Sequence, residues 1–224
     1  MIENSIKYLI FDYGDVLVYP VTGNWFITPN FYNIIEKNEI DMDALGIGLN
    51  KASKFISSKM LTEEEEYSAF KKVYEIVLKE LGINENLKEK AEKIAYEFVY
   101  SNEKHKLYED VEENLERLSK KYKLIMLSDN WPCAHRLLKK WGIYKYFEKV
   151  YISSEYDVQK KDKVFFDYPI KDFAINCNEA IFIDDKEELL DIAKNKGLQV
   201  ILMNRNECNK ESKYGIITSL NNIE

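Results

Sequence analysis

Residues 6–20 read IKYLIFDYGDVLVYP, and the order of apolar and acidic side chains in them indicates the class of fold. The apolar run YLIF, at 8–11, is short and consists of aromatic and aliphatic side chains. Runs of this kind are typical of strands that are buried on both faces of a parallel sheet. The run therefore predicts a buried strand that ends in a carboxylate, Asp12, with Gly14 and Asp15 following closely.

Further apolar runs have the same character, and segments with helical periodicity lie between them. The expected strands are 123–128 (KLIMLS), 149–153 (KVYIS), 180–183 (AIFI) and 199–203 (QVILM). The expected helices between them are 131–141, 163–174 and 186–196. This alternation predicts an α/β fold with a doubly wound parallel sheet, Rossmann-like, with right-handed crossovers.

The segment that follows the first strand contains no second strand until about residue 122 and has a helical pattern throughout. Its expected helices are 30–37, 43–57, 61–81 and 86–100, and a further helix at 110–121 returns the chain to the sheet. Thr62 and Glu65 form a capping-box pattern, Gly82 closes that helix, and Asn86 is the expected cap of the next. We therefore predict a core domain of residues 1–19 and 105–224, with an all-helical insertion at 20–104.

Composition restricts the partners and the location of the protein. The formal net charge of −7 argues against a nucleic-acid partner, because neutralising phosphates requires a basic surface. No apolar run approaches the roughly 20 residues of a membrane-spanning helix, and no signal peptide is evident. Cys133, Cys177 and Cys208 are scattered and suggest neither a disulfide framework nor a zinc site. We expect a cytoplasmic monomer or homodimer that binds neither nucleic acid nor membrane.

The carboxyl ends of parallel strands meet at one edge of a sheet, where ligands bind in folds of this class. The residues that follow the expected strands there are Asp12, Ser128, Asp129, Asn130, Lys160, Asp184 and Asp185. Each, taken singly, has a structural explanation as a turn, a cap or a surface residue. Together, the crowded carboxylates call for a hard divalent cation, and the lysine and hydroxyl suit an anion. This set predicts phosphoryl transfer to an aspartate nucleophile.

The ordered segments IFDYGDVLV, LIMLSDN, SSEYDVQKKDKVFF and IFIDDKEELLDIAKNKGLQVI resemble the haloacid dehalogenase (HAD) superfamily of hydrolases, over nearly the whole chain. The third segment is similar to the family's Lys-Pro-Asp-Pro-x-x-Phe pattern. Lys160, Asp162 and Phe166 stand at its matching positions, and Lys161 stands where proline is usual. The helical insertion resembles the cap domain of one branch of this superfamily.

The resemblance implies a phosphatase that acts on a small phosphorylated metabolite, such as a sugar phosphate, through an aspartyl-phosphate intermediate. Asp12 would be the nucleophile, Ser128 would bind phosphate oxygens, and Lys160 would pair with Asp12 and the phosphoryl group. The implied cofactor is Mg²⁺, and its implied ligands are Asp12, the Gly14 carbonyl, Asp185 and Asp184. The implied substrate-binding residues follow the strand of the second segment and are Ser128, Asp129, Asn130 and Trp131.

The chain departs from the family pattern at position 14. Typical phosphatases of this family read Asp-x-Asp, where the second carboxylate protonates the leaving oxygen and activates water, but Gly14 stands here. Asp15, one residue later, would face the opposite side of an extended segment. Three interpretations stay open: Asp15 or another group replaces the acid, the enzyme is slow or needs good leaving groups such as acyl phosphates or sugar 1-phosphates, or the chain is a binding or regulatory protein.

A further alternative is 2-haloacid dehalogenation, which uses the aspartate nucleophile without a metal. Dehalogenases of the family lack the aspartate pair that ends IFIDD in this chain. An uncompensated carboxylate pair would repel the carboxylate of a haloacid substrate. The sequence therefore favours a phosphatase over a dehalogenase.

Overall fold

The computed structural model describes residues 5–205 and 211–223, and its contacts divide the chain into two units. The sheet unit comprises Met1–Tyr19, Leu107–Asn130 and Ala134–Glu224, and the helical unit comprises Pro20–Lys106 and Trp131–Cys133. Cys208 lies outside the described residues. Within the described residues, no helix combines the length and the apolar character that crossing a bilayer requires.

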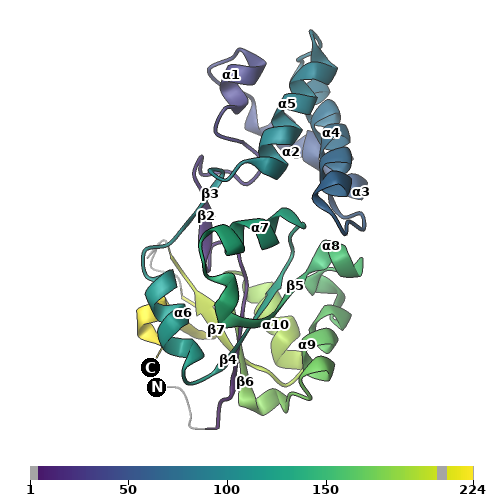
Figure 1. The fold of residues 1–224 in the computed structure, drawn as a ribbon. Helices are drawn as coiled ribbons and strands as arrows, with labels where there is room; N and C mark the ends of the chain where they lie inside the picture. The colour runs from purple at the N-terminus through teal and green to yellow at the C-terminus, as the bar shows by residue number, and fades with distance from the viewer. Residues whose placement is uncertain (1–4, 206–210, 224) are drawn as a thin grey trace. The chain divides into compact units, whose positions relative to one another are not determined.

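The sheet unit is built on a six-stranded sheet in which every neighbouring pair of strands is parallel (Figure 1). Its strands, in spatial order, are β5 (Phe147–Ile152), β4 (Lys123–Ser128), β1 (Tyr8–Phe11), β6 (Ala180–Asp184), β7 (Gln199–Met203) and β8 (Gly215–Ile217). The α-helices of this part of the chain are α6 (Val111–Ser119), α7 (Cys133–Lys140), α8 (Ser153–Tyr156), α9 (Asp167–Asp172) and α10 (Glu187–Asn195). Its 3₁₀ helices are η1 (Tyr144–Tyr146), η2 (Lys160–Asp162), η3 (Val164–Phe166), η4 (Cys177–Glu179) and η5 (Leu220–Asn222). The doubly wound parallel α/β fold is confirmed.

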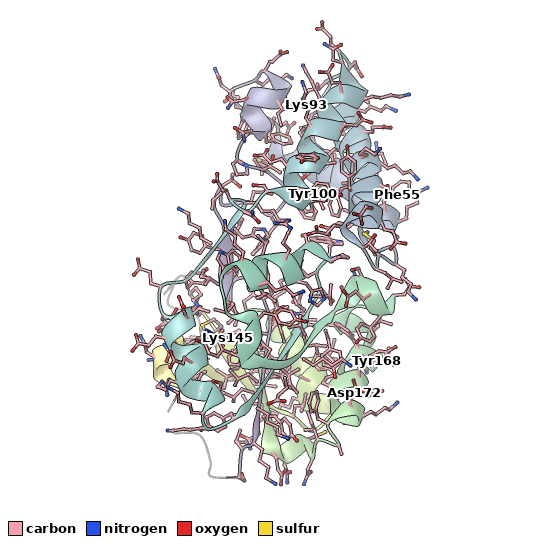
Figure 2. The ribbon with its side chains drawn as sticks, viewed as in Figure 1. Phe55, Lys93, Tyr100, Lys145, Tyr168 and Asp172 are labelled. Carbon is pink, nitrogen blue, oxygen red and sulfur yellow. The ribbon has the colours of Figure 1, made fainter. Side chains whose placement is uncertain are left out.

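The central position of β1 places Asp12 at the point where the order of the strands reverses. β1 pairs with β4 on one side and with β6 on the other, so that Ile10 lies opposite both Ile125 and Phe182. All three side chains belong to the buried core. At the edge of the sheet, Asp172 of α9, which is labelled in Figure 2, accepts a hydrogen bond from Tyr151 of β5 at 2.8 Å.

The helical unit contains α1 (Phe31–Ile35), α2 (Met42–Lys51), α3 (Ser53–Ile56), α4 (Glu63–Glu80) and α5 (Leu87–Tyr100). Its core is aromatic, and the rings of Phe70 and Phe98 stack with a centroid distance of 4.1 Å. The short strands β2 (Val18–Pro20) and β3 (His105–Leu107) pair with each other where the chain passes between the units.

Most expected elements form, and the differences have local causes. The helix expected over 43–57 is interrupted at Ala52, which separates α2 from α3. The Thr62 hydroxyl caps α4 by accepting from the Glu65 N–H, but the Glu65 carboxylate accepts from the Leu61 N–H, so the reciprocal box is incomplete. Asn86 stands at the N-cap position of α5 as expected, but its φ is +51° and its side chain makes no cap hydrogen bond.

The segment Trp131–Cys133, expected in the core domain, groups with the helical unit. The Trp131 ring lies 5.0 Å from that of Phe70 and 5.7 Å from that of Phe98, measured between centroids. Its Nε1–H donates to the Ile56 carbonyl at 2.9 Å. The packing of one large side chain therefore assigns this segment to the helices.

Candidate active site

The Asp12 carboxylate is held one residue beyond β1. Its backbone N–H donates to the Ile183 carbonyl at 3.0 Å, which continues the pairing of β1 with β6 past the last residue of the strand. Lys160 Nζ lies 2.8 Å from Asp12 Oδ1 and 2.6 Å from Asp184 Oδ2. The lysine therefore bridges carboxylates that follow, or end, two neighbouring strands.

Lys160 is 2% exposed, and two features of the chain hold it in place. The turn η2 is closed by Asp162, whose carboxylate accepts from the Gln159 N–H at 2.9 Å. The Lys160 N–H itself donates to Asp129 Oδ1 at 2.9 Å. Burial alone would lower the pKa of Lys160, but the surrounding carboxylates, Asp12 foremost, hold it above its ordinary value. Lys160 is therefore a permanent positive charge.

The carboxylates of Asp12, Asp184 and Asp185 offer oxygens that all lie within 4.8 Å of one another. Asp184 is fully buried, and its two oxygens are occupied by Lys160 Nζ and by the Lys186 N–H, at 2.6 and 2.9 Å. Burial, followed by the charges of Asp12 and Asp184, raises the pKa of Asp185 to about 7. The cluster holds more negative charge than one lysine offsets.

These residues fit a divalent cation. Asp12 Oδ1 is buried and, among the described residues, has no hydrogen bond of standard geometry, although the Lys160 ammonium stands beside it. Three carboxylates opposite one ammonium leave a surplus of negative charge, which hard oxygen-ligated cations such as Mg²⁺ neutralise. Because both Asp184 oxygens are already engaged, Asp12 and Asp185 are the residues that would hold the cation directly. The Gly14 carbonyl stays a predicted ligand.

The residues after β4 take different places. Ser128 ends β4 and is buried, and the Asn130 N–H donates to Ser153 Oγ at 3.1 Å. Asp129, expected to bind substrate, accepts from the Lys160 backbone and so supports the lysine turn. Trp131 packs among the aromatic rings of the helical unit. A substrate-binding role for these residues stays a prediction.

The segment after Asp12 forms a tight turn and is not extended. Asp15 has a left-handed φ of +53°, and its N–H donates to the Val18 carbonyl at 2.8 Å. Asp15 is half-buried and does not belong to the three-carboxylate cluster. Burial and the charge of Asp15 raise the pKa of Tyr108, although Arg205 opposes this. The structure therefore does not bring Asp15 into the cluster with Asp12.

Sequence reasoning missed Arg205, which braces this turn. Its guanidinium donates to the Val16 carbonyl at 2.6 Å, its Nη1 donates to both carboxylate oxygens of Asp110, and it lies 4.3 Å from the Tyr108 ring centroid. A signal was available, because Arg205 lies two residues beyond the carboxyl end of β7.

Comparisons with known proteins bear on the family and the fold of the chain. The model of the haloacid dehalogenase-like hydrolase family matches residues 45–203. A curated relative, drimenol cyclase drtB of Aspergillus calidoustus, is 24% identical over 154 residues, which cover 66% of this chain but only 26% of the relative.

Two solved structures share the fold over almost the whole chain. A 2-haloacid dehalogenase from Pseudomonas syringae pv. Tomato has a TM-score of 0.68 at 16% identity, with 96% of this chain and 95% of that one covered. A HAD family enzyme from Bacteroides thetaiotaomicron, in complex with magnesium and inorganic phosphate, has a TM-score of 0.63 at 20% identity, with 92% and 98% covered.

Proposed function

Because the chain belongs to the haloacid dehalogenase-like hydrolase family, we propose that it is a Mg²⁺-dependent phosphatase of small phosphorylated metabolites, with the helical unit as its cap. The observation that carries the proposal is the surplus of carboxylates around the lysine. Lys160 bridges Asp12 and Asp184, and Asp185 adds a third carboxylate that forms no ion pair within 4.0 Å among the described residues. A cation at this place, together with Lys160, suits the dianionic phosphate group of such a substrate.

Asp12 is the proposed nucleophile. One carboxylate oxygen attacks phosphorus, the bond from phosphorus to the leaving oxygen breaks, and an aspartyl-phosphate forms. Lys160 stays charged and stabilises the negative charge of the transferring group, and Ser128 would hold its oxygens. Asp12 and Asp185 would hold Mg²⁺, which would supply further positive charge for the transferring group. Water then hydrolyses the aspartyl-phosphate and restores Asp12.

The leaving oxygen needs a proton unless it departs readily as an anion. Gly14 supplies none, and Asp15 lies outside the carboxylate cluster. We therefore place the preferred substrates among phosphates with good leaving groups, such as acyl phosphates or sugar 1-phosphates. A second candidate function, favoured by Gly14 alone, is a binding or regulatory protein that has lost turnover. Dehalogenation is disfavoured, because Asp185 would repel the carboxylate of a haloacid.

The test is phosphate release from a panel of phosphorylated metabolites by the purified chain, in Mg²⁺ and in EDTA. We expect turnover in Mg²⁺ only, and none by Asp12→Asn. Equal turnover by Asp12→Asn would overturn the mechanism. Binding of Mg²⁺ without turnover of any substrate would support the binding protein, and chloride release from 2-chloropropionate in EDTA would support the dehalogenase.

A further inference from the structure

A second group of buried polar side chains lies in the helical unit, outside the candidate active site. Glu66 is 0% exposed, Lys104 is 5% exposed and Cys133 is 1% exposed. Glu66 Oε2 accepts a hydrogen bond from the Cys133 N–H at 2.8 Å, and Lys104 Nζ donates to Cys133 Sγ at 3.2 Å. Cys133 is thus held by its backbone and by its side chain.

This arrangement is a poor source of stability. Glu66 Oε1 is buried and has no hydrogen-bond partner among the described residues. Within the same part of the chain, Glu66 and Lys104 form no ion pair within 4.0 Å, and the Lys104 ammonium instead lies 4.1 Å from the Phe98 ring centroid. Buried charges that are not directly paired are costly compared with apolar side chains of similar size. Their presence indicates a role other than stabilisation.

Cys133 ends the loop that begins at Ser128. At the start of this loop, the Asn130 N–H donates to Ser153 Oγ and Asp129 accepts from the Lys160 N–H, both within the sheet unit. At its end, Trp131 donates to the Ile56 carbonyl and Cys133 donates to Glu66, both within the helical unit. The anchoring of the loop changes from one unit to the other at the peptide bond between residues 130 and 131.

We propose that Glu66 is a positioning residue for the phosphate-binding loop, a proposal that rests on the proposed function. By fixing the Cys133 amide, Glu66 fixes the end of a six-residue segment whose other end carries Ser128. So short a segment has little freedom to absorb a shift at one end. A misplacement of about 1 Å at a binding group can lower a rate by roughly 10²-fold.

The test compares variants in the full-length protein. Glu66→Ala removes the acceptor, and Glu66→Gln keeps an oxygen for the Cys133 amide. Glu97→Ala is the matched control, because Glu97 accepts from Asn30 within the same unit at 2.7 Å and does not touch the loop. The measurements are hydrogen exchange of the Asn130 amide, steady-state kinetics, and inhibition by inorganic phosphate.

We expect Glu66→Ala to speed exchange at Asn130, to lower kcat/KM by roughly 10- to 100-fold, and to weaken phosphate inhibition. Glu66→Gln should restore most of each property, and Glu97→Ala should change none of them. If Glu66→Ala does not fold, the double variant Glu66→Leu/Lys104→Met removes both buried charges and also removes the anchor.

Unchanged exchange at Asn130 in folded Glu66→Ala, or in the folded double variant, would overturn the proposal. So would a loss of thermal stability with kcat/KM preserved, because Glu66 would then be structural only. If the wild-type protein hydrolyses no phosphate, the proposed function fails. Exchange at Asn130 then still decides whether Glu66 positions the loop.

Discussion

Raising the pH should destabilise the metal-free protein through Asp185, and Mg²⁺ should reverse the effect. Folding raises the pKa of the Asp185 carboxyl from an ordinary 3.8 to about 7, first because of burial and then because of the charges of Asp12 and Asp184. Between these values the native state binds the proton and the unfolded state does not, so the free energy of unfolding falls as the pH rises. Above pH 7 the full cost of ionising Asp185 is present.

The magnitude follows from the change in proton affinity. A rise in the pKa of Asp185 from 3.8 to about 7 corresponds to a free energy of roughly 4 kcal/mol, at about 1.4 kcal/mol for each tenfold change in proton affinity. Asp185 is only partly buried, and solvent screening reduces this to about 2 kcal/mol. For a chain of this length, about 2 kcal/mol corresponds to a shift in Tm of roughly 4–8 °C.

The assay is thermal unfolding of wild type and Asp185→Asn between pH 5 and 8, in EDTA and in Mg²⁺. A second group has the opposite sign: burial, then the charge of Lys104, lowers the pKa of His105 to about 2. His105 therefore contributes stability above pH 6.5 that is lost as the pH falls below it. The difference between the two proteins isolates Asp185, since His105 is present in both.

We expect the Tm of Asp185→Asn in EDTA to rise relative to the Tm of wild type as the pH rises. At pH 8 the variant should have the higher Tm. Mg²⁺ should raise the Tm of wild type more at pH 8 than at pH 5.5, because the cation binds only the ionised site. Parallel pH profiles of the two proteins in EDTA would refute the reasoning. So would an effect of Mg²⁺ that does not depend on pH.

Lys160→Met should lower the free energy of unfolding in urea by about 3–5 kcal/mol, because it leaves buried carboxylates without their counter-charge; a loss below 1 kcal/mol would contradict this. Gly48→Ala should cost about 1–3 kcal/mol by overpacking, since its Cβ would lie 2.9 Å from a backbone atom of α4. Gly46→Ala, in the same helix with nothing within 4 Å, is the matched control and should gain up to about 1 kcal/mol. Gly14→Asp should speed hydrolysis of unactivated phosphomonoesters by roughly 10²–10⁴-fold and leave acyl phosphates nearly unchanged; equal effects on both classes would exclude a missing acid.

The positions that sequence reasoning identified correctly are those fixed by short-range pattern. Asp12 and Asp184 follow or end buried strands, and strand ends in a parallel sheet share an edge whatever the details of the loops. Lys160 was different, because residues 153–163 have no periodic pattern that places a side chain. Its assignment depended on the ordered resemblance to a family, and the structure shows the reason in the Asp162 and Asp129 contacts that shape its turn.

Other placements depend on contacts between residues that are distant in the sequence. Glu66 stands in a run of four glutamates that opens α4, yet it is buried, and its carboxylate accepts from the Cys133 N–H, 67 residues away. Trp131 follows a strand end and was expected to bind substrate, which stays a prediction, and its ring packs against Phe70 and Phe98. No local pattern carries such information.

Gly14 leaves the proposed reaction without the proton donor that is usual at this position. The turn after Asp12 does not stay extended, because Asp15 adopts a left-handed φ and the turn closes on Val18. Asp15 lies outside the carboxylate cluster, and its replacement of the missing acid stays a prediction. Under the proposed function, with Asp12 as nucleophile beside Lys160, the first half of the reaction depends on how readily the leaving group departs. Substrates that leave as stable anions are then the ones that we expect this site to turn over without the usual proton donor.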